Sequence, residues 1–334
     1  MKRTVVVIHP GALGDVLLAV PAIKKLASEF PEHGIVLIAG AAVSRLLADC
    51  RVIDEWISME SQVCLGLFAK LGCQSIELQA HFKRCDAVVA WADDGENALA
   101  ALLREYAMPR IWIQSPFSSA LRSTHQSDRF IEALGKDGAN GLGDGTLQIP
   151  DHLIEEGRIR LERMGVRRSG SLLLVHPGSG SAYKCLRPEK LASILQKLEQ
   201  CGLSPVLVEG PADHDRVEAV SRLLTNKPPV LRDLDLSQLA GVLVHAERYL
   251  GHDSGITHLA ALLGVRTVAV FGPTDHRRWG PRGCQVTIVG GAPCVCHTWQ
   301  AVRICHEKPC LDLRVEQILT ALGIEETRES CKLL

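Results

Sequence analysis

The sequence predicts an α/β protein built from two doubly wound, Rossmann-like domains, each a parallel sheet with helices on both faces. Short β-branched runs alternate with amphipathic helical segments, which is typical of buried parallel strands joined by helices. The phrase VVVIHPGALG at residues 5–14 returns as LLLVHPGSGS at residues 172–181, which indicates two similar halves. At 334 residues, the chain is also longer than one hydrophobic core usually organises.

In the first half, the run of β-branched residues before His9 predicts a strand, and a helix is expected over residues 13–30. Further elements follow in the same alternation: strands at GIVLIA (34–39), DAVVAW (86–91) and RIWIQ (110–114), and a helix at GENALAALLREY (95–106). The Gly- and Asp-rich stretch at 135–152 is expected to be loop and linker. We therefore expect domains at residues 1–150 and 151–334.

The second half repeats this pattern after the strand that ends at His176. Strands are expected at SPVLVEG (204–210), ERYLGH (247–252), RTVAVFG (266–272) and QVTIVG (285–290), and helices at PEKLASILQKLEQ (188–200), LSQLAGVLVHA (236–246) and GITHLAALLG (255–264). Because ligands of open parallel sheets bind outside the carboxyl ends of the strands, functional residues are expected in the loops that follow the strands. For two such domains that face each other, we expect the ligands to bind in the cleft between the carboxyl ends of the two sheets.

The bulk composition excludes several classes of protein. A formal net charge of -1 and an aromatic content of 4% argue against a nucleic-acid partner, which would need a basic surface or stacking platforms. The basic start at Lys2 and Arg3 is followed too soon by His9, Pro10 and Gly11 to be a signal peptide. With no apolar stretch long enough to span a membrane, we expect a cytoplasmic protein.

An acidic residue, Asp15, stands in the first turn of the first helix. Helix N-termini after a Gly turn commonly hold phosphate, and a fixed carboxylate would repel one. Either Asp15 only complements the helix dipole, or this turn serves another chemistry and the phosphate binds elsewhere.

The second half has a better phosphate site in HPGSGSAYK, residues 176–184. Glycines let the backbone approach an anion, while Ser179, Ser181 and Lys184 add side-chain donors and a positive charge. Farther on, Asp253-Ser254-Gly255 can cap a helix and offer N–H groups to a diphosphate, and His258 lies on the same helical face as Ser254. Taken alone, the first pattern is equally compatible with a structural turn, and the second favours a helix cap and a buried histidine.

Taken together, three motifs resemble glycosyltransferase family 9, the bacterial heptosyltransferase family: GALGDVLLAVPAI, HPGSGSAYK and DSGITHLAALLGVRTVAVFGPTD. Their order and spacing match along essentially the whole chain. The resemblance implies a GT-B fold, with the acceptor held by the N-terminal domain and a nucleotide-sugar by the C-terminal domain. It also implies transfer of a sugar, commonly a heptose from ADP-heptose, onto a lipopolysaccharide core or a related lipid-linked glycan.

The resemblance assigns roles to individual residues. Asp15 matches the catalytic base and Lys184 the lysine that contacts phosphate, so both are expected to be catalytic. Substrate contacts are expected from Ala12, Gly14, Ser179, Gly180, Arg187, Asp253, Ser254, Gly255, Ile256 and His258. The base would take the acceptor hydroxyl proton while the cation stabilises the leaving diphosphate, a direct displacement that inverts the anomeric centre. The chain departs from the family where Lys184 is followed by CLRPE instead of a Trp-Pro pair, and Arg187 could share its role.

The C-terminal region concentrates cysteines, among them Cys294, Cys296, Cys305 and Cys310. They are enough for tetrahedral zinc, but the irregular spacing favours plain thiols or a facultative disulfide. The reaction implied by the resemblance needs no cofactor and no metal. Asp233 and Asp235 mimic a metal-binding DxD, but they precede a helix, where such residues are expected as caps.

Two alternatives remain open from the sequence. A sugar-nucleotide epimerase of the same fold would act without an acceptor, and a non-catalytic nucleotide-sugar-binding protein could retain the scaffold. The presence of Asp15 together with Lys184 argues against the second alternative. For the transferase, we expect a monomer that works as a cytoplasmic enzyme, peripheral to the inner face of the cell membrane where a lipid-linked acceptor lies.

Overall fold

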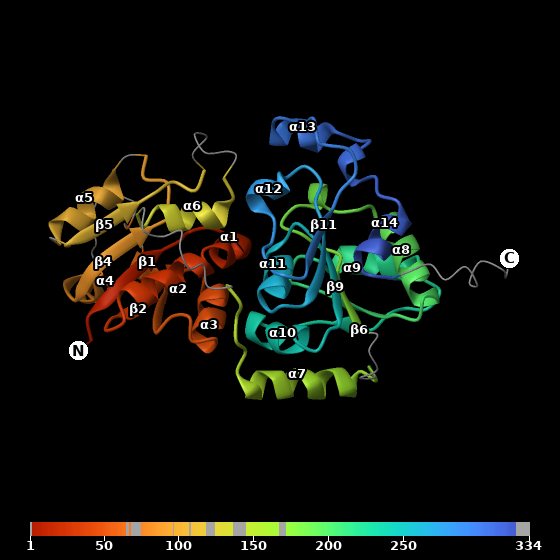
Figure 1. Cartoon of the computed structure of the whole chain (residues 1–334), viewed down its shortest axis with the longest axis horizontal. Coiled ribbons are helices and arrows are strands. Elements are labelled where there is room, and N and C mark those ends of the chain that lie inside the picture. The colour runs from red at the N-terminus through yellow and green to blue at the C-terminus, as the bar shows by residue number, and fades with distance from the viewer. Residues whose placement is uncertain are drawn as a thin grey trace. The chain divides into compact units, whose positions relative to one another are not determined.

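The structure is a computed structural model, and its described residues are 2–64, 67, 75–95, 97–106, 108–117, 124–135, 145–166 and 172–324. The chain forms two compact units, Met1–Pro150 and Asp151–Leu334. Each unit is a parallel sheet with helices on its faces (Figure 1), which confirms the predicted α/β class.

The first unit has a sheet of order β3-β2-β1-β4-β5, and every pair of neighbouring strands is parallel. Its strands are β1 (Thr4–Ile8), β2 (Gly34–Ala39), β3 (Glu55–Ser58), β4 (Cys85–Ala90) and β5 (Arg110–Ile113). β1 and β2 are buried along their full length, as expected of central strands covered on both faces. The strand order reverses next to β1, which places the loop after β1 at a ligand-binding position of such sheets.

The helices of the first unit are α1 (Leu13–Leu18), α2 (Val20–Glu29), α3 (Ala41–Asp49), α4 (Ile76–Lys83), α5 (Ala98–Glu105) and α6 (Gln126–Glu132). Side chains of α4 and α5 share a hydrophobic cluster with β1, β2 and β4. α2 packs against α6, and α1 against α3. A short 3₁₀ turn lies at Gln62–Cys64.

The helix expected over residues 13–30 is interrupted. α1 ends at Leu18 and α2 begins at Val20, with Ala19 between them. Pro21 lies in the first turn of α2, where its missing N–H costs nothing, whereas inside a continuous helix it would remove a hydrogen bond. The break leaves α1 as a short segment that carries Asp15.

The second unit has a parallel sheet of order β11-β10-β9-β6-β7-β8. Its strands are β6 (Leu172–His176), β7 (Ser204–Val208), β8 (Val230–Leu231), β9 (Arg248–His252), β10 (Arg266–Val270) and β11 (Val286–Val289). The order reverses between β6 and β9, so the loops after these two strands lie side by side at the carboxyl edge.

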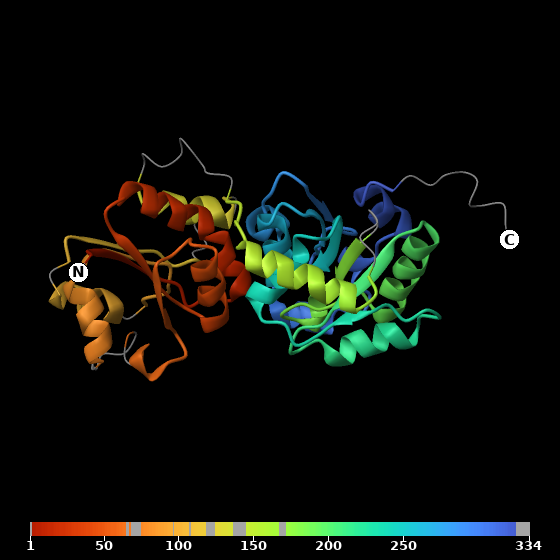
Figure 2. The ribbon, with the colours of Figure 1, turned by 90° about the horizontal axis from the view of Figure 1, so that it is seen from below.

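Two groups of helices cover this second sheet (Figures 1 and 2). α8 packs against α9 and α14, while α10 packs against α7 and α11. The bounds are α7 (Asp151–Arg163), α8 (Pro188–Gln200), α9 (His214–Arg222), α10 (Leu236–Leu243), α11 (Gly255–Leu262), α12 (His276–Trp279), α13 (Trp299–Ile304) and α14 (Val315–Ala321). Short 3₁₀ turns lie at Ala182–Lys184 and Pro309–Leu311.

Two glycines bring α7 and α10 close together. A Cβ on Gly157 would lie 2.1 Å from the carbonyl oxygen of Gly241, and a Cβ on Gly241 would lie 2.1 Å from the carbonyl oxygen of Leu153. Real Cβ atoms do not approach so closely, so the packing of these helices requires glycine at both positions.

In the part of the chain that the structure describes, no helix is both long and apolar enough for a membrane crossing. The middle of the predicted linker, residues 136–144, lies outside the described residues. Residues 145–150 have no regular structure, and α7 begins directly after them.

Candidate functional site

The first turn of unit 1 carries Asp15 at the edge where β1 ends. The Asp15 carboxylate oxygen Oδ2 accepts a hydrogen bond from the backbone N–H of Ala12 at 3.2 Å. The Asp15 side chain is only partly buried, Gly14 is also partly buried and Ala12 is exposed. The carboxylate therefore serves as a helix-start acceptor and can still be reached from outside, which keeps both interpretations of Asp15 compatible with its geometry.

A buried histidine supports this turn from beneath. His9 is fully buried, and its Nδ1 accepts a hydrogen bond from the N–H of Gly11 at 3.1 Å. Burial lowers the pKa of His9 to about 4, so the ring is neutral at pH 7. A Cβ on Gly11 would lie 2.7 Å from His9 Cε1 and 2.9 Å from Asp15 Cβ, so the corner requires glycine and holds Asp15 close to the sheet.

In unit 2, the loop after β6 and the loop after β9 are joined directly. The hydroxyl of Ser179 donates to the backbone carbonyl of Asp253 at 2.5 Å. The hydroxyl of Ser181 accepts from the N–H of Tyr183 at 3.4 Å, as the cap of the 3₁₀ turn. A Cβ on Gly180 would meet nothing within 4 Å, so the space beside this glycine is open. The serine hydroxyls expected as phosphate donors thus make contacts within the protein.

Lys184 and Asp253 form an ion pair at the beginning of α11. Lys184 Nζ lies 2.8 Å from Asp253 Oδ2, and the side chains are 21% and 9% exposed. Ser254 is the N-cap of α11, and its Oγ accepts from the N–H of Thr257. The first N–H groups of a helix lack intrahelical partners and carry the positive end of its dipole. A cation and a helix N-terminus therefore lie together, an arrangement that can bind an anion.

The remaining residues of this predicted loop differ in their access to solvent. Gly255 and Ile256 are partly buried, whereas His258 is 5% exposed. The accessible part of the turn is thus its N-terminal end.

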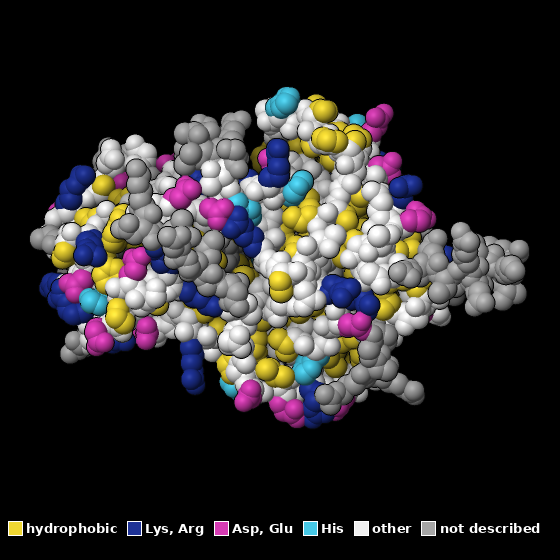
Figure 3. Space-filling model, viewed as in Figure 1, with side chains coloured by type: hydrophobic (Ala, Val, Ile, Leu, Met, Phe, Trp, Pro, Cys, Tyr) yellow, Lys and Arg dark blue, Asp and Glu magenta, His cyan; other side chains and the backbone are white. Residues whose placement is uncertain are grey.

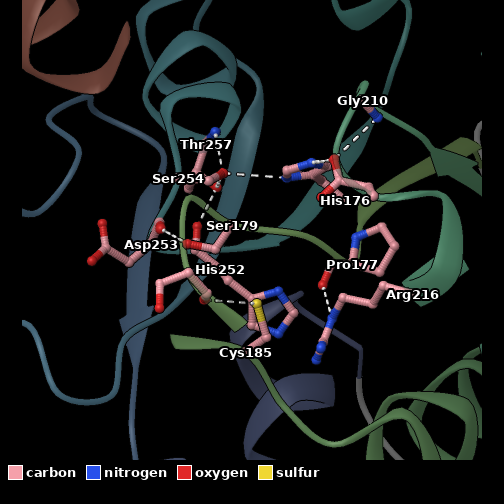
Figure 4. Close-up of polar contacts among 12 residues, drawn as sticks. His176, Pro177, Ser179, Cys185, Gly210, Arg216, His252, Asp253, Ser254 and Thr257 are labelled. Carbon is pink, nitrogen blue, oxygen red and sulfur yellow. Dashed lines mark hydrogen bonds and ion pairs between the residues drawn. The ribbon is translucent and has the colours of Figure 1, made fainter. Parts of the chain in front are cut away.

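A hydrogen-bonded network beneath the turn was not found from the sequence. His176, the last residue of β6, lies between two partners. Its Nδ1 is 3.2 Å from Ser254 Oγ (Figure 4), and its Nε2 is 2.9 Å from Asp213 Oδ2. Asp213 also accepts from the N–H of Gly210 at 3.0 Å. The network connects the loops after β6, β7 and β9, and the repeated His-Pro-Gly corner was the one signal that could have indicated it.

The loop after β7 and the start of α9 carry two acids, Asp213 and Asp215. The structure separates them, because Asp213 is buried and Asp215 is exposed. Burial alone would raise the pKa of Asp213, but the hydrogen bond and charge interaction with His176, the Gly210 N–H and Arg216 together lower it. Asp213 is therefore ionised, and its hydrogen bonds hold the neighbouring loops together.

The cationic residue Arg187 is the N-cap residue of α8, and its Nη2 donates to the carbonyl oxygen of His306 at 2.7 Å. Arg216 donates to the carbonyl oxygen of Pro177 at 2.5 Å (Figure 4). Both guanidinium groups hold backbone around the loop that carries Lys184.

Asp235 of the DxD mimic is the N-cap of α10 and accepts from the N–H of Gln238 at 2.8 Å, as its position before a helix predicted.

The four cysteines of the C-terminal region are free thiols, with no disulfide among them: Cys294, Cys296, Cys305 and Cys310. Removal from water and the neighbouring thiols raise the pKa of Cys296 and that of Cys310 to about 11. These two thiols are protonated at neutral pH. No group of three or more His, Cys, Asp or Glu side chains arranged to hold a metal ion occurs among the residues described.

Comparison with known proteins identifies a family domain in the chain. Residues 145–308 match the sequence model of glycosyltransferase family 9 (heptosyltransferase). The chain is 24% identical over 285 residues to lipopolysaccharide heptosyltransferase 3 of Escherichia coli (strain K12), which covers 80% of this chain and 82% of that protein. Residues 145–308 therefore carry a glycosyltransferase family 9 domain.

Solved structures agree with this assignment at the level of the fold. The family 9 glycosyltransferase from Veillonella parvula superposes with a TM-score of 0.79 at 20% identity, over 96% of each chain. E. coli ADP-heptose lps heptosyltransferase II gives a TM-score of 0.73 at 18% identity, over 96% of this chain and 97% of that chain. The chain therefore has the GT-B fold, as the motifs predicted. The family domain and the curated relative identify a heptosyltransferase-like glycosyltransferase, and they favour it over the epimerase and the non-catalytic binding protein.

Proposed function

We propose that this glycosyltransferase moves a heptose from ADP-heptose onto a lipopolysaccharide core or a related lipid-linked glycan, with inversion at the anomeric carbon. The observation that carries the proposal is the pairing of Lys184 with Asp253 at the N-terminus of α11. A curated relative is named a lipopolysaccharide heptosyltransferase, and an E. coli heptosyltransferase, WaaC, with a similar fold has been solved with ADP, at a TM-score of 0.61.

In this proposal, unit 2 (residues 151–334) binds the donor. Negative charge develops on the diphosphate as the sugar departs, and fixed positive groups stabilise it. The Lys184 ammonium has three N–H donors; one meets Asp253, which leaves others for phosphate oxygens. The N–H groups of Gly255 and Ile256 add helix-end donors, and the space beside Gly180 lets a ligand approach the backbone. Ser179 and Ser254 act indirectly, by holding the two loops together.

Unit 1 (residues 1–150) binds the acceptor, and Asp15 is the base. Its carboxylate takes the proton of the attacking hydroxyl as the new glycosidic bond forms, a contribution of roughly 10² to 10⁴ in rate. The small residues Ala12 and Gly14 leave room beside the carboxylate for a sugar. One displacement without a covalent enzyme intermediate inverts the anomeric centre, and the scheme uses only side chains of this chain. Because the proposed acceptor is lipid-linked, we place the enzyme, as a monomer, at the inner face of the membrane.

Binding measurements on single variants test the division of roles. By calorimetry with ADP, we expect Lys184→Ala to weaken affinity about tenfold or more, the cost of losing a charge-assisted contact, and Asp15→Ala to leave it within about threefold. Lys227→Ala is the matched control, because Lys227 is exposed and precedes β8 at the opposite edge of the sheet.

Substrate identity requires turnover with defined donors. We expect ADP-heptose to be consumed only when a heptose-deficient core glycolipid is present, and other nucleotide-sugars to be poor donors. Equal loss of ADP affinity in the Lys184 and Asp15 variants, or turnover with a different nucleotide-sugar in preference to ADP-heptose, would contradict the proposal.

A further inference from the structure

The cysteine-rich C-terminal segment, residues 292–310, contacts the Lys184 loop at three places. Lys184 Nζ lies 5.5 Å from the centre of the Trp299 ring. Lys308 Nζ lies 5.1 Å from the centre of the Tyr183 ring. The third contact is the hydrogen bond from Arg187 to the carbonyl oxygen of His306. A segment far downstream in the sequence is thus attached along the loop that carries the proposed phosphate-binding lysine.

Trp299 does not have the surroundings of a core residue. It is the first residue of α13, which Thr298 caps by accepting from the N–H of Ala301 at 3.1 Å. Trp299 is 50% exposed, and on the same segment Val295 and Ile304 are exposed too. Hydrophobic side chains reach the surface over α13 (Figure 3). Packing into a core therefore does not explain why an indole is found beside Lys184.

The Lys184 ammonium lies between two partners of different kinds. Asp253 attracts it by charge, with the atoms 2.8 Å apart, and the Trp299 ring attracts it through the negative face of its π-system. A lysine side chain has four flexible carbon–carbon bonds and loses considerable rotamer freedom when it is held. Two partners restrict the ammonium more than the ion pair alone and leave donors of the ammonium for an incoming anion.

We propose that Trp299 is a positioning residue for Lys184, which keeps the ammonium at the N-terminus of α11, where a diphosphate binds. This inference rests on the proposed function, in which Lys184 contacts the donor diphosphate. The indole acts through Lys184 and does not contact the nucleoside. Removing the indole therefore weakens the binding of phosphate-bearing ligands and leaves a nucleoside without phosphate unaffected.

Calorimetry with ADP and with adenosine tests the inference on three variants of the full chain. Trp299→Ala is expected to raise the Kd for ADP about tenfold, within the range of a partly desolvated cation–π contact. Trp299→Phe keeps an aromatic face and should restore most of the affinity. Ile304→Ala, an exposed residue of the same helix, is the matched control and should bind as the wild type does. The affinity for adenosine should be the same in all variants.

A double variant separates positioning from a general structural role. If Trp299 acts through Lys184, then Trp299→Ala should have little further effect on ADP binding once Lys184→Ala is present. Additive losses, an equal loss of adenosine affinity, or a phenylalanine variant as weak as the alanine variant would overturn the inference. If Lys184→Ala weakens ADP binding but Trp299→Ala does not, the inference alone fails. If neither variant weakens it, the proposed donor site fails as well.

Discussion

At the scale of single residues, one buried carboxylate connects three loops, the third of them through His176. Asp213 pairs with His176 at 2.9 Å and accepts from the N–H of Gly210 at 3.0 Å, while His176 reaches Ser254 at the beginning of α11. A Cβ on Gly178 would lie 1.8 Å from Asp213 Oδ1, so the loop after β6 also closes tightly on this carboxylate. A charged group so enclosed stabilises the loops only while its partners remain in place.

Replacing this carboxylate by an amide tests its role. Asp213→Asn removes the charge that pairs with His176, and we expect it to lower the free energy of unfolding by about 1–3 kcal/mol, the usual cost of disrupting a buried hydrogen-bonded group. The exposed neighbour provides the control: Asp215→Asn should change the free energy of unfolding by less than about 0.5 kcal/mol. Urea unfolding measures both, and equal values for the two variants would contradict the structural role of Asp213.

The sequence indicates some of these residues and not others, for a physical reason. Asp15, Lys184 and Asp253 stand directly after predicted strands, in motifs whose local pattern already indicates a ligand-binding turn. His176 and Asp213 lie far apart in the sequence and acquire their partners only when the carboxyl ends of β6, β7 and β9 meet. Trp299, which contacts Lys184 on its other side, lies far downstream in the sequence, so no local pattern indicates that the two residues meet.

At the scale of elements, local pattern predicts the strands well and the helix packing poorly. β1 and β2 are buried along their full length as expected, whereas β11, made only of β-branched residues, is partly exposed. β3 and β8 are too short for their sequence pattern to indicate a strand. The predicted helix over residues 13–30 is interrupted at Ala19, because Pro21 fits the first turn of a helix and not its interior. The close packing of α7 on α10 cannot be predicted from either helix, because it depends on two glycines meeting across the interface.

The glycine pair leads to a prediction at this scale. Gly157→Ala would place a methyl group 2.1 Å from the carbonyl oxygen of Gly241, and the helices would have to separate. We expect the free energy of unfolding to fall by about 1–3 kcal/mol, as in overpacked cores, although alanine favours helices intrinsically. Glu156→Ala, an exposed change in the same helix, should have little effect. An unchanged midpoint of urea denaturation for Gly157→Ala would show that α7 and α10 do not pack this closely.

At the scale of the whole molecule, each unit contains a histidine buried next to a loop of the proposed site. Burial lowers the pKa of His9 in unit 1 to about 4 and that of His252 in unit 2 to about 3. His252 Nε2 accepts from the N–H of Leu186 at 3.1 Å, so it supports the Lys184 loop as His9 supports the Asp15 turn. Both rings are neutral in the folded protein and exposed to protonation in the unfolded chain.

The lower pKa of His9 and His252 in the folded protein than in the unfolded chain makes the free energy of unfolding depend on pH. An unfolded histidine titrates near 6.5, above both folded pKa values, so the unfolded chain binds more protons as the pH falls below about 6.5. The stabilisation is therefore complete above that pH and is lost progressively toward pH 4, by up to about 1.4 kcal/mol per pH unit for each histidine.

Two substitutions make this prediction specific. Asn at position 9 and Gln at position 252 each keep an acceptor for the neighbouring N–H and cannot titrate in this range. Unfolding free energies of His9→Asn and His252→Gln, measured between pH 7.5 and pH 5, should fall less steeply than those of the wild type. Parallel curves for the wild type and both variants would mean that the buried rings do not cause the loss.

The central claim is that Asp15 removes the acceptor proton while unit 2 holds the donor. Asn at this position keeps the size and the hydrogen bond to Ala12 but lacks proton affinity. Steady-state kinetics with ADP-heptose and a core glycolipid acceptor, with Glu32→Gln as an exposed control, is the most direct test. We predict that Asp15→Asn lowers kcat by about 10² or more with little change in the donor KM. Turnover near that of the wild type would show that Asp15 only begins a helix and would contradict the account.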